Sequence, residues 1–305
     1  MIDHWRVGPL LARLARPRTE RRVRLAVVAD PHVAAGTGTW KLAHRSERRF
    51  ERAIDHANRC DAAVLAGDLT GDGRTGSFET VERSLSALDV PWTAVPGNHD
   101  VPKSFDDHSG IGVSAFAQRY TPGLPFAWEV GPVTVVGVNT ASAADGSLRE
   151  TWGGRVGEST RQWLADRLPE IDTPVIVTHH NLGTLPENPG GKWTNFPVED
   201  AAETRRVLAE NDVGLVLSGH HHVPAVLDHG GPVEVLAPAV CSYPQAMLDV
   251  AIGPDGTAVR LVPLADRREV AEARRYAARG KPLAVGVLEA VDRRVGELPL
   301  YDDRH

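Results

Sequence analysis

Short runs of apolar residues, many of them β-branched, recur along the chain, and each gives way to a polar segment that usually contains glycine. Apolar runs of this length, bounded by turn-forming residues, are typical of buried strands. The pattern therefore predicts strands over residues 23–29, 62–66, 92–95, 133–138, 175–178, 213–217, 233–236, 247–252 and 258–262.

Between these runs, apolar residues recur at helical spacing, as in Phe50, Ala53, Ile54 and Ala57. A period near 3.6 residues places such side chains on one face of a helix. We expect helices over residues 46–58, 77–88, 160–168, 198–210 and 267–278. Strands that alternate with helices, together with several strands at hairpin spacing near the end, favour an α/β layered fold.

The two ends of the chain differ from the middle, so we divide it into a basic N-terminal arm (1–22), a main domain (23–265) and a C-terminal helix with an extension (266–305). The arm holds six arginines. We expect it to form a short surface helix that packs Leu10, Leu11 and Leu14 on the body. A membrane-surface or partner-binding arm is the alternative. The pattern does not specify the structure after Gly280.

Composition excludes several classes of protein. The net charge of −6 argues against a stable nucleic-acid complex, which normally requires clustered basic residues. No apolar run approaches the roughly 18 residues that span a bilayer, and no signal-peptide pattern opens the chain. Cys60 and Cys241 form neither a disulfide framework nor a metal-type spacing. We expect a cytoplasmic protein without a membrane span.

Polar residues with metal-binding side chains follow five of the predicted strands. Sites in α/β sheets form where strands end. Carboxylates together with imidazoles suit Mn²⁺, Fe and Zn²⁺, and paired ions suit displacement at phosphorus. Each motif alone has an ordinary structural explanation, such as a turn or a buried histidine pair, but their joint occurrence has none. The motifs are Asp30-Pro31-His32, Gly67-Asp68, Gly97-Asn98-His99-Asp100, His179-His180 and Gly219-His220-His221-His222.

The order D-x-H, G-D, G-N-H-D, H, G-H-x-H resembles the calcineurin-like metallophosphoesterase superfamily over roughly Val23 to Leu264. It is most similar to the bacterial branch that includes class III cyclic-nucleotide phosphodiesterases. The resemblance implies a four-layer α/β/β/α sandwich with two mixed β-sheets flanked by helices. It also implies a binuclear enzyme that hydrolyses a small phosphodiester or phosphomonoester, such as a nucleotide or cyclic nucleotide, by attack of a metal-bridging hydroxide.

The resemblance also assigns roles to residues. Two divalent ions (Mn, Fe or Zn) are implied, and Asp68 would bridge them. His99 would contact the phosphate or protonate the leaving oxygen. We prefer His179 to His180 as a ligand because the predicted strand 175–178 leads straight into it, but His180 remains open. The first ion would be held by Asp30, His32 and His222, and the second by Asn98, His179 and His220.

Substrate-binding residues are harder to assign. His221 should point away from its neighbours if the segment is extended, yet we keep it as a candidate. Trp193, in the long loop 181–197, could stack on a base or simply anchor the loop. Trp40 and His44 are similar candidates.

Two departures from the family pattern bear on function. Many members carry an aspartate three residues after the bridging one, where it orients the catalytic histidine. Gly71 stands there in this chain, and Asp72 or Asp100 could substitute. Prolines that often follow the histidine pair in cyclic-nucleotide enzymes are replaced by Asn181-Leu182, which weakens that substrate assignment.

Three alternatives compete with a phosphoesterase of small molecules. A nuclease is disfavoured by the acidic charge. A non-catalytic metal-binding scaffold on the same fold would be expected to lack ligands, and none is missing. A Ser-His-Asp hydrolase is excluded because G-x-S-x-G is absent. The expected partner is a small phosphoester, and the sequence leaves the oligomeric state, including a homodimer, open.

Overall fold

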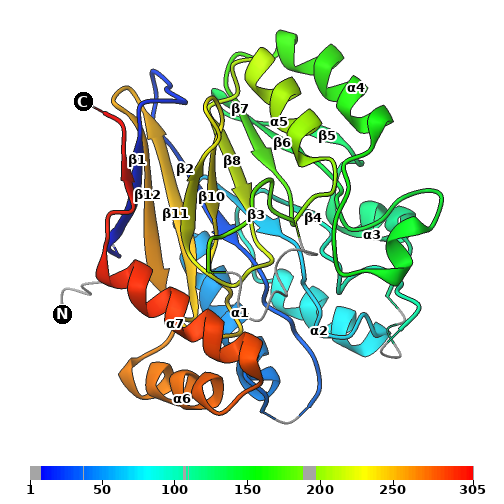
Figure 1. The fold of residues 1–305 in the computed structure, drawn as a ribbon, viewed down its shortest axis with the longest axis vertical. Helices are drawn as coiled ribbons and strands as arrows, with labels where there is room; N and C mark the ends of the chain where they lie inside the picture. The colour runs from blue at the N-terminus through cyan, green and yellow to red at the C-terminus, as the bar shows by residue number, and fades with distance from the viewer. Residues whose placement is uncertain (1–7, 37, 106–107, 109, 188–196, 305) are drawn as a thin grey trace.

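Two β-sheets pack face to face in the computed structural model, which describes residues 8–36, 38–105, 108, 110–187 and 197–304 (Figure 1). In spatial order, the first sheet comprises β13 (Tyr301–Asp302), β1 (Leu10–Leu14), β12 (Gly256–Pro263), β11 (Ala246–Gly253), β2 (Val23–Val28), β3 (Ala62–Ala66) and β4 (Trp92–Val95). The second comprises β5 (Phe126–Val130), β6 (Val133–Gly137), β7 (Pro174–Val177), β8 (Leu215–Ser218), β10 (Val233–Leu236) and β9 (Ala225–Asp228).

The main core lies between the sheets. It is formed by alternate residues of each strand, whose side chains point to the same face of the sheet. Leu25 and Val27 of β2 face this core, and Leu215 and Leu217 of β8 meet them from the other sheet. The intervening residue Ala26 faces outward, toward the helices. Because both faces of these strands are buried, they read as continuous apolar runs rather than alternating ones.

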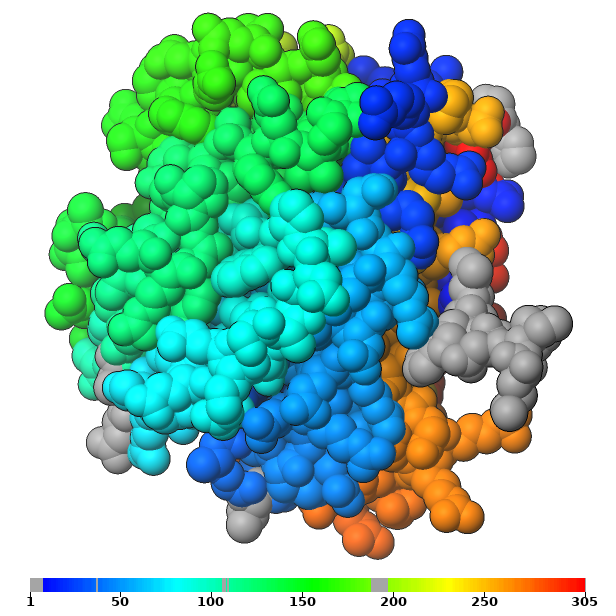
Figure 2. Space-filling view, turned by 180° about the vertical axis from the view of Figure 1, so that it is seen from behind, coloured from blue at the N-terminus to red at the C-terminus, as the bar shows by residue number. Residues whose placement is uncertain are grey.

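Helices cover both outer faces. Against the first sheet lie α1 (Ala43–Ala57), α2 (Thr75–Leu85) and α3 (Val113–Tyr120). The blue and cyan segments that contain α1 and α2 cover much of the face in Figure 2. Against the second sheet lie α4 (Glu158–Arg167) and α5 (Ala201–Glu210), seen in Figure 1. The four-layer α/β/β/α arrangement with two mixed sheets is confirmed.

A helical pair follows the last long strand. Figure 1 shows α6 (Arg267–Ala278) and α7 (Pro282–Gly296) side by side at one end of the sandwich. The Asp266 side chain caps α6 by accepting from two backbone N–H groups, and the Glu269 carboxylate accepts from the Asp266 backbone N–H, which completes a capping box. The α6 prediction is confirmed, whereas α7 lies in the extension that the pattern left unassigned. No described helix has the length and apolar character needed to cross a bilayer.

The prediction of a helix in the N-terminal arm is wrong. Residues Leu10–Leu14 form β1, which pairs antiparallel with β12 and parallel with β13. Leu11 and Leu14 are buried in the core between the sheets. A helix could not place this backbone beside β12, and sheet pairing outweighs the weak local preference. Elements β5, β9 and α3 are also additions to the predicted set.

This strand supplies a first test of the fold. We expect Leu14→Ala to lower the free energy of unfolding by about 2–5 kcal/mol, because it leaves a cavity in the core. Urea unfolding measures the loss, with Val295→Ala, 40% exposed on α7, as the control. Equal stability of the two variants would show that β1 is dispensable to the core.

Candidate metal centre

Five strand ends bring the predicted polar residues to one end of the sandwich. Strands β2, β3 and β4 are parallel neighbours in one sheet, and β7 and β8 are parallel neighbours in the other. Asp30 follows β2, Asp68 follows β3 and His179 follows β7, yet ligand atoms of all three lie within 4.8 Å of one another. The motifs therefore form one cluster that spans both sheets. We call it the metal centre: Asp30, His32, Asp68, Asn98, His179, His220 and His222.

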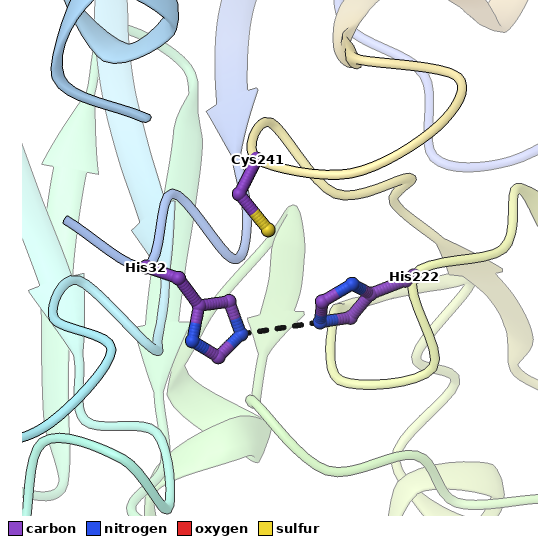
Figure 3. A group of neighbouring side chains, drawn as sticks. All are labelled: His32, His222 and Cys241. Atoms are coloured by element: carbon purple, nitrogen blue, oxygen red, sulfur yellow. Dashed lines mark hydrogen bonds between the residues drawn. The ribbon is translucent and has the colours of Figure 1, made fainter. Parts of the chain in front are cut away.

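One half of the metal centre joins His32 to His222. Their Nε2 atoms are 3.1 Å apart, and the rings point toward each other in Figure 3. Oδ1 of Asp30 lies 3.3 Å from Nε2 of His222. Cys241, whose sulfur points toward the two rings in Figure 3, completes a group that could hold an ion.

The other half is built around His179. Its Nε2 atom lies 3.1 Å from Oδ1 of Asn98 and 3.2 Å from Nδ1 of His220. Oδ2 of Asp68 is 3.4 Å from the same Nε2 and 3.3 Å from Nε2 of His32. A single carboxylate oxygen thus contacts both halves.

The donor set fits divalent ions. Ligand atoms held at about 2.0–2.2 Å from a common ion lie roughly 3 Å apart, as these atoms do. Oδ1 of Asp30 is buried, and its contact with Nε2 of His222 lacks hydrogen-bond geometry, although a buried polar atom is normally satisfied. The outer nitrogens are engaged: Nδ1 of His179 donates to the Ala66 carbonyl, and Nδ1 of His222 bonds Oγ of Ser242, both at 2.8 Å. Such bonds leave Nε2 facing the centre.

The backbone around the metal centre adopts an unfavourable conformation. Positive φ is uncommon for residues other than glycine and is concentrated at functional sites. Gly97 shows how closely the loops approach, because a Cβ on it would lie 2.1 Å from Oδ1 of Asp68. Five of the seven predicted ligands have positive φ: Asp30 (54°), His32 (44°), Asp68 (53°), His220 (71°) and His222 (61°).

Burial and charge compete in this cluster. Burial alone would raise the pKa of Asp30 and Asp68, but the surrounding histidines hold both pKa values below the ordinary range. Burial, and then the charge of Lys41, lowers the pKa of His99 well below its usual value. Burial followed by Lys41 lowers the pKa of His32 to about 4. His32 is thus held neutral, the state in which imidazole binds metal. At His179 burial is outweighed by the neighbouring Asp68 carboxylate, which raises the pKa to about 9.

His99 lies at the edge of the metal centre and is oriented by backbone. Its Nδ1 donates to the Gly71 carbonyl at 2.8 Å, and its ring stacks on Trp152 with centroids 4.6 Å apart. The proposed substitutes for the missing aspartate are wrong. Asp72 accepts from the Arg74 backbone N–H. Asp100 accepts from three backbone N–H groups.

The two histidines that neighbour predicted ligands, His180 and His221, lie in different surroundings. Both ring nitrogens of His180 are hydrogen-bonded, to Oγ1 of Thr140 and to the Trp152 carbonyl, each at 2.9 Å. One of them still lies within 4.8 Å of ligand atoms of His179 and His220. His221 is buried in the wall of a cavity beside the metal centre. The segment is not extended, because His220 and His222 on either side have left-handed backbones.

That cavity measures about 410 Å³ and opens next to His99. Of the two further candidates for substrate binding, Trp40 lines this cavity, whereas His44 faces Glu272 of α6. Trp193 lies outside the described residues. Several other lining residues could not be predicted, because nothing in their local sequence pattern marks them: Lys41, Trp152, Lys281, Leu283 and Val287.

Comparisons with known proteins agree with this geometry. A family model described as calcineurin-like phosphoesterase matches residues 23–224. The 3',5'-cyclic adenosine monophosphate phosphodiesterase CpdA of Escherichia coli (strain K12) is 26% identical over 235 residues, covering 73% of this chain and 78% of that protein. A probable cyclic nucleotide phosphodiesterase of Synechococcus is 27% identical over 204 residues, covering 65% of this chain and 74% of that protein.

Among solved structures, purple acid phosphatase PPD1 from yellow lupin seeds is similar in fold, with a TM-score of 0.58 and 13% identity. The similarity covers 83% of this chain and 53% of that one. The family match spans most of the chain and contains every residue of the metal centre. This chain therefore belongs to the calcineurin-like phosphoesterase family and is a phosphoric ester hydrolase.

Proposed function

We propose that this protein is a binuclear phosphodiesterase that hydrolyses a small nucleotide-type diester, with a cyclic nucleotide as the leading candidate. The observation that supports two ions is the position of Asp68, whose Oδ2 lies 3.3 Å from one half of the metal centre and 3.4 Å from the other. Asp30, His32 and His222 would hold the first ion, and Asn98, His179 and His220 the second. Mn, Fe and Zn all suit these ligands.

The ions, when bound, would polarise the ester oxygens and make water nucleophilic near neutral pH. The chain's own residues would then position the ester. His99 faces the cavity with Nε2, because its Nδ1 is held by Gly71. From there it would contact the phosphoryl group or, once Nε2 is protonated to form the imidazolium, give that proton to the leaving oxygen. Trp152, stacked on the His99 ring, would fix its orientation.

The cavity favours a substrate with an aromatic ring and an anionic group. Trp40 lines the cavity, and a base could stack on its ring. Lys41 and Lys281 bring positive charge to the same cavity. His221 lies in the cavity wall and stays a candidate contact. The relatives named as cyclic nucleotide phosphodiesterases support the same substrate class.

The test is an assay with Mn²⁺ and with chelator, using bis-p-nitrophenyl phosphate, p-nitrophenyl phosphate and 3',5'-cyclic AMP. We expect about two bound metals per chain, faster release from the diester than from the monoester, and hydrolysis of the cyclic nucleotide. All three activities should disappear on chelation, because the ligands alone supply no nucleophile. Two bound metals with no turnover of any ester would instead favour a non-catalytic scaffold.

A further inference from the structure

Lys41 brings a positive charge to the edge of the metal centre. Its Nζ atom lies 3.2 Å from Nε2 of His99 and 3.3 Å from Nε2 of His32. Across the described ranges of the chain, no aspartate or glutamate forms an ion pair with this ammonium. Its contacts are therefore with imidazole nitrogens, which are neutral acceptors.

The loop that carries Lys41 is anchored on both sides of this residue. Leu42 is fully buried in a cluster with Ala277 and Val287 of the C-terminal helical pair. Trp40 packs against the same cluster, and its ring centroid lies 5.1 Å from that of His222. Because both neighbours are packed, the Lys41 backbone is held beside the metal centre.

The two imidazole nitrogens that contact Lys41 would have other partners in the metal-bound, substrate-bound protein. Nδ1 of His99 donates to Gly71, so Nε2 of His99 is the acceptor for the ammonium. Nε2 of His32 would bind an ion, and its lone pair would then be unavailable to Lys41. An ammonium carries three donors, and a partly buried one requires acceptors. Phosphoryl oxygens placed beside His99 would supply them.

From this geometry we infer that Lys41 is a phosphate-binding residue, which donates a hydrogen bond to a non-bridging oxygen of the bound phosphoester. The inference rests on the proposed function, since it takes the ester to lie between the metal centre and His99. A charge-assisted bond to phosphate is about twice as strong as a neutral one. Because Trp40 and Leu42 hold its backbone, the donor would lie beside that oxygen before charge develops on it.

Calorimetric titration of the manganese-loaded protein with inorganic phosphate tests this role without turnover. Lys41→Met should bind phosphate about 10- to 100-fold more weakly, the effect of losing one hydrogen bond between charged groups. Lys41→Arg should keep affinity within a few-fold, because it keeps a donor and a charge. Arg206→Met removes an equal charge from an exposed position on α5 and should bind like the wild type.

Each outcome has a separate meaning. Unchanged phosphate affinity in Lys41→Met, with both metals retained, overturns the inference and leaves the proposed function standing. Loss of metal from Lys41→Met also overturns it, because Lys41 would then support the metal centre rather than phosphate. Weakened phosphate binding in a protein that hydrolyses no diester supports the role of Lys41 and refutes the proposed reaction.

Discussion

Replacing Asp68 by alanine is expected to abolish phosphodiester hydrolysis and to reduce bound metal below that of the wild type. The carboxylate is 2% exposed, and one of its oxygens contacts His32 on one side and His179 on the other. Its other oxygen accepts the His99 backbone N–H at 2.8 Å. Removing Asp68 therefore takes a shared ligand from both ions and frees the loop that carries His99.

Elemental analysis and the bis-p-nitrophenyl phosphate assay check this result together. Asp72→Ala is the matched control, because Asp72 lies four residues on and bonds the backbone of Arg74 outside the metal centre. Asn98→Ala should likewise lose activity, with loss of metal at the half that contains His179. An Asp68→Ala protein with full activity and two metals would refute the ligand assignment.

Strand ends were the most predictable part of the structure. Residues Trp92–Val95 and Val233–Leu236 form strands with the predicted bounds. Buried parallel strands produce apolar runs that stand out, and the chain must turn directly after them. Because the ends of parallel strands meet, the motifs after them could be placed together without knowing the sheet order. The N-terminal strand β1 lacked this signal, since its pairing partner β12 lies more than 240 residues away in sequence.

Residues that act from loops or through the backbone could not be predicted in the same way. His99 is oriented by the carbonyl of Gly71. Because every residue has a backbone carbonyl, the sequence does not reveal which one is used. Trp152 reaches the ring of His99 from a distant loop. Lys41 is held beside His99 by the packing of Leu42 on the C-terminal helices. Local periodicity contains no information on such long-range contacts.

The wall of the cavity is built from two parts of the chain. The metal centre lies within the matched family region, whereas Lys281, Leu283 and Val287 of the cavity wall lie after it. One wall of the cavity is therefore built by the C-terminal helical pair, and the same pair packs against the loop that holds Trp40 and Lys41. Part of the cavity wall is thus separate in sequence from the residues of the metal centre.

The second large effect is expected from His99→Ala, which should slow hydrolysis by about 10²–10⁴-fold, the range typical of a lost general acid. Both metals should remain bound, because the seven residues of the metal centre are unchanged. The rate loss should be greatest for esters whose leaving oxygen is strongly basic. A p-nitrophenolate group leaves readily without a proton, so bis-p-nitrophenyl phosphate should be less affected than 3',5'-cyclic AMP.

His44→Ala is the matched control for this prediction, because His44 faces Glu272 and Tyr276 of α6 rather than the cavity. It should retain the wild-type rate with both substrates. An equal rate loss for the two esters in His99→Ala would assign His99 to phosphate binding instead of proton transfer, because a contact with the phosphoryl oxygens does not depend on the leaving group. Loss of one metal would make His99 a ligand, in keeping with its place within 4.8 Å of the ligand atoms of His32 and Asp68.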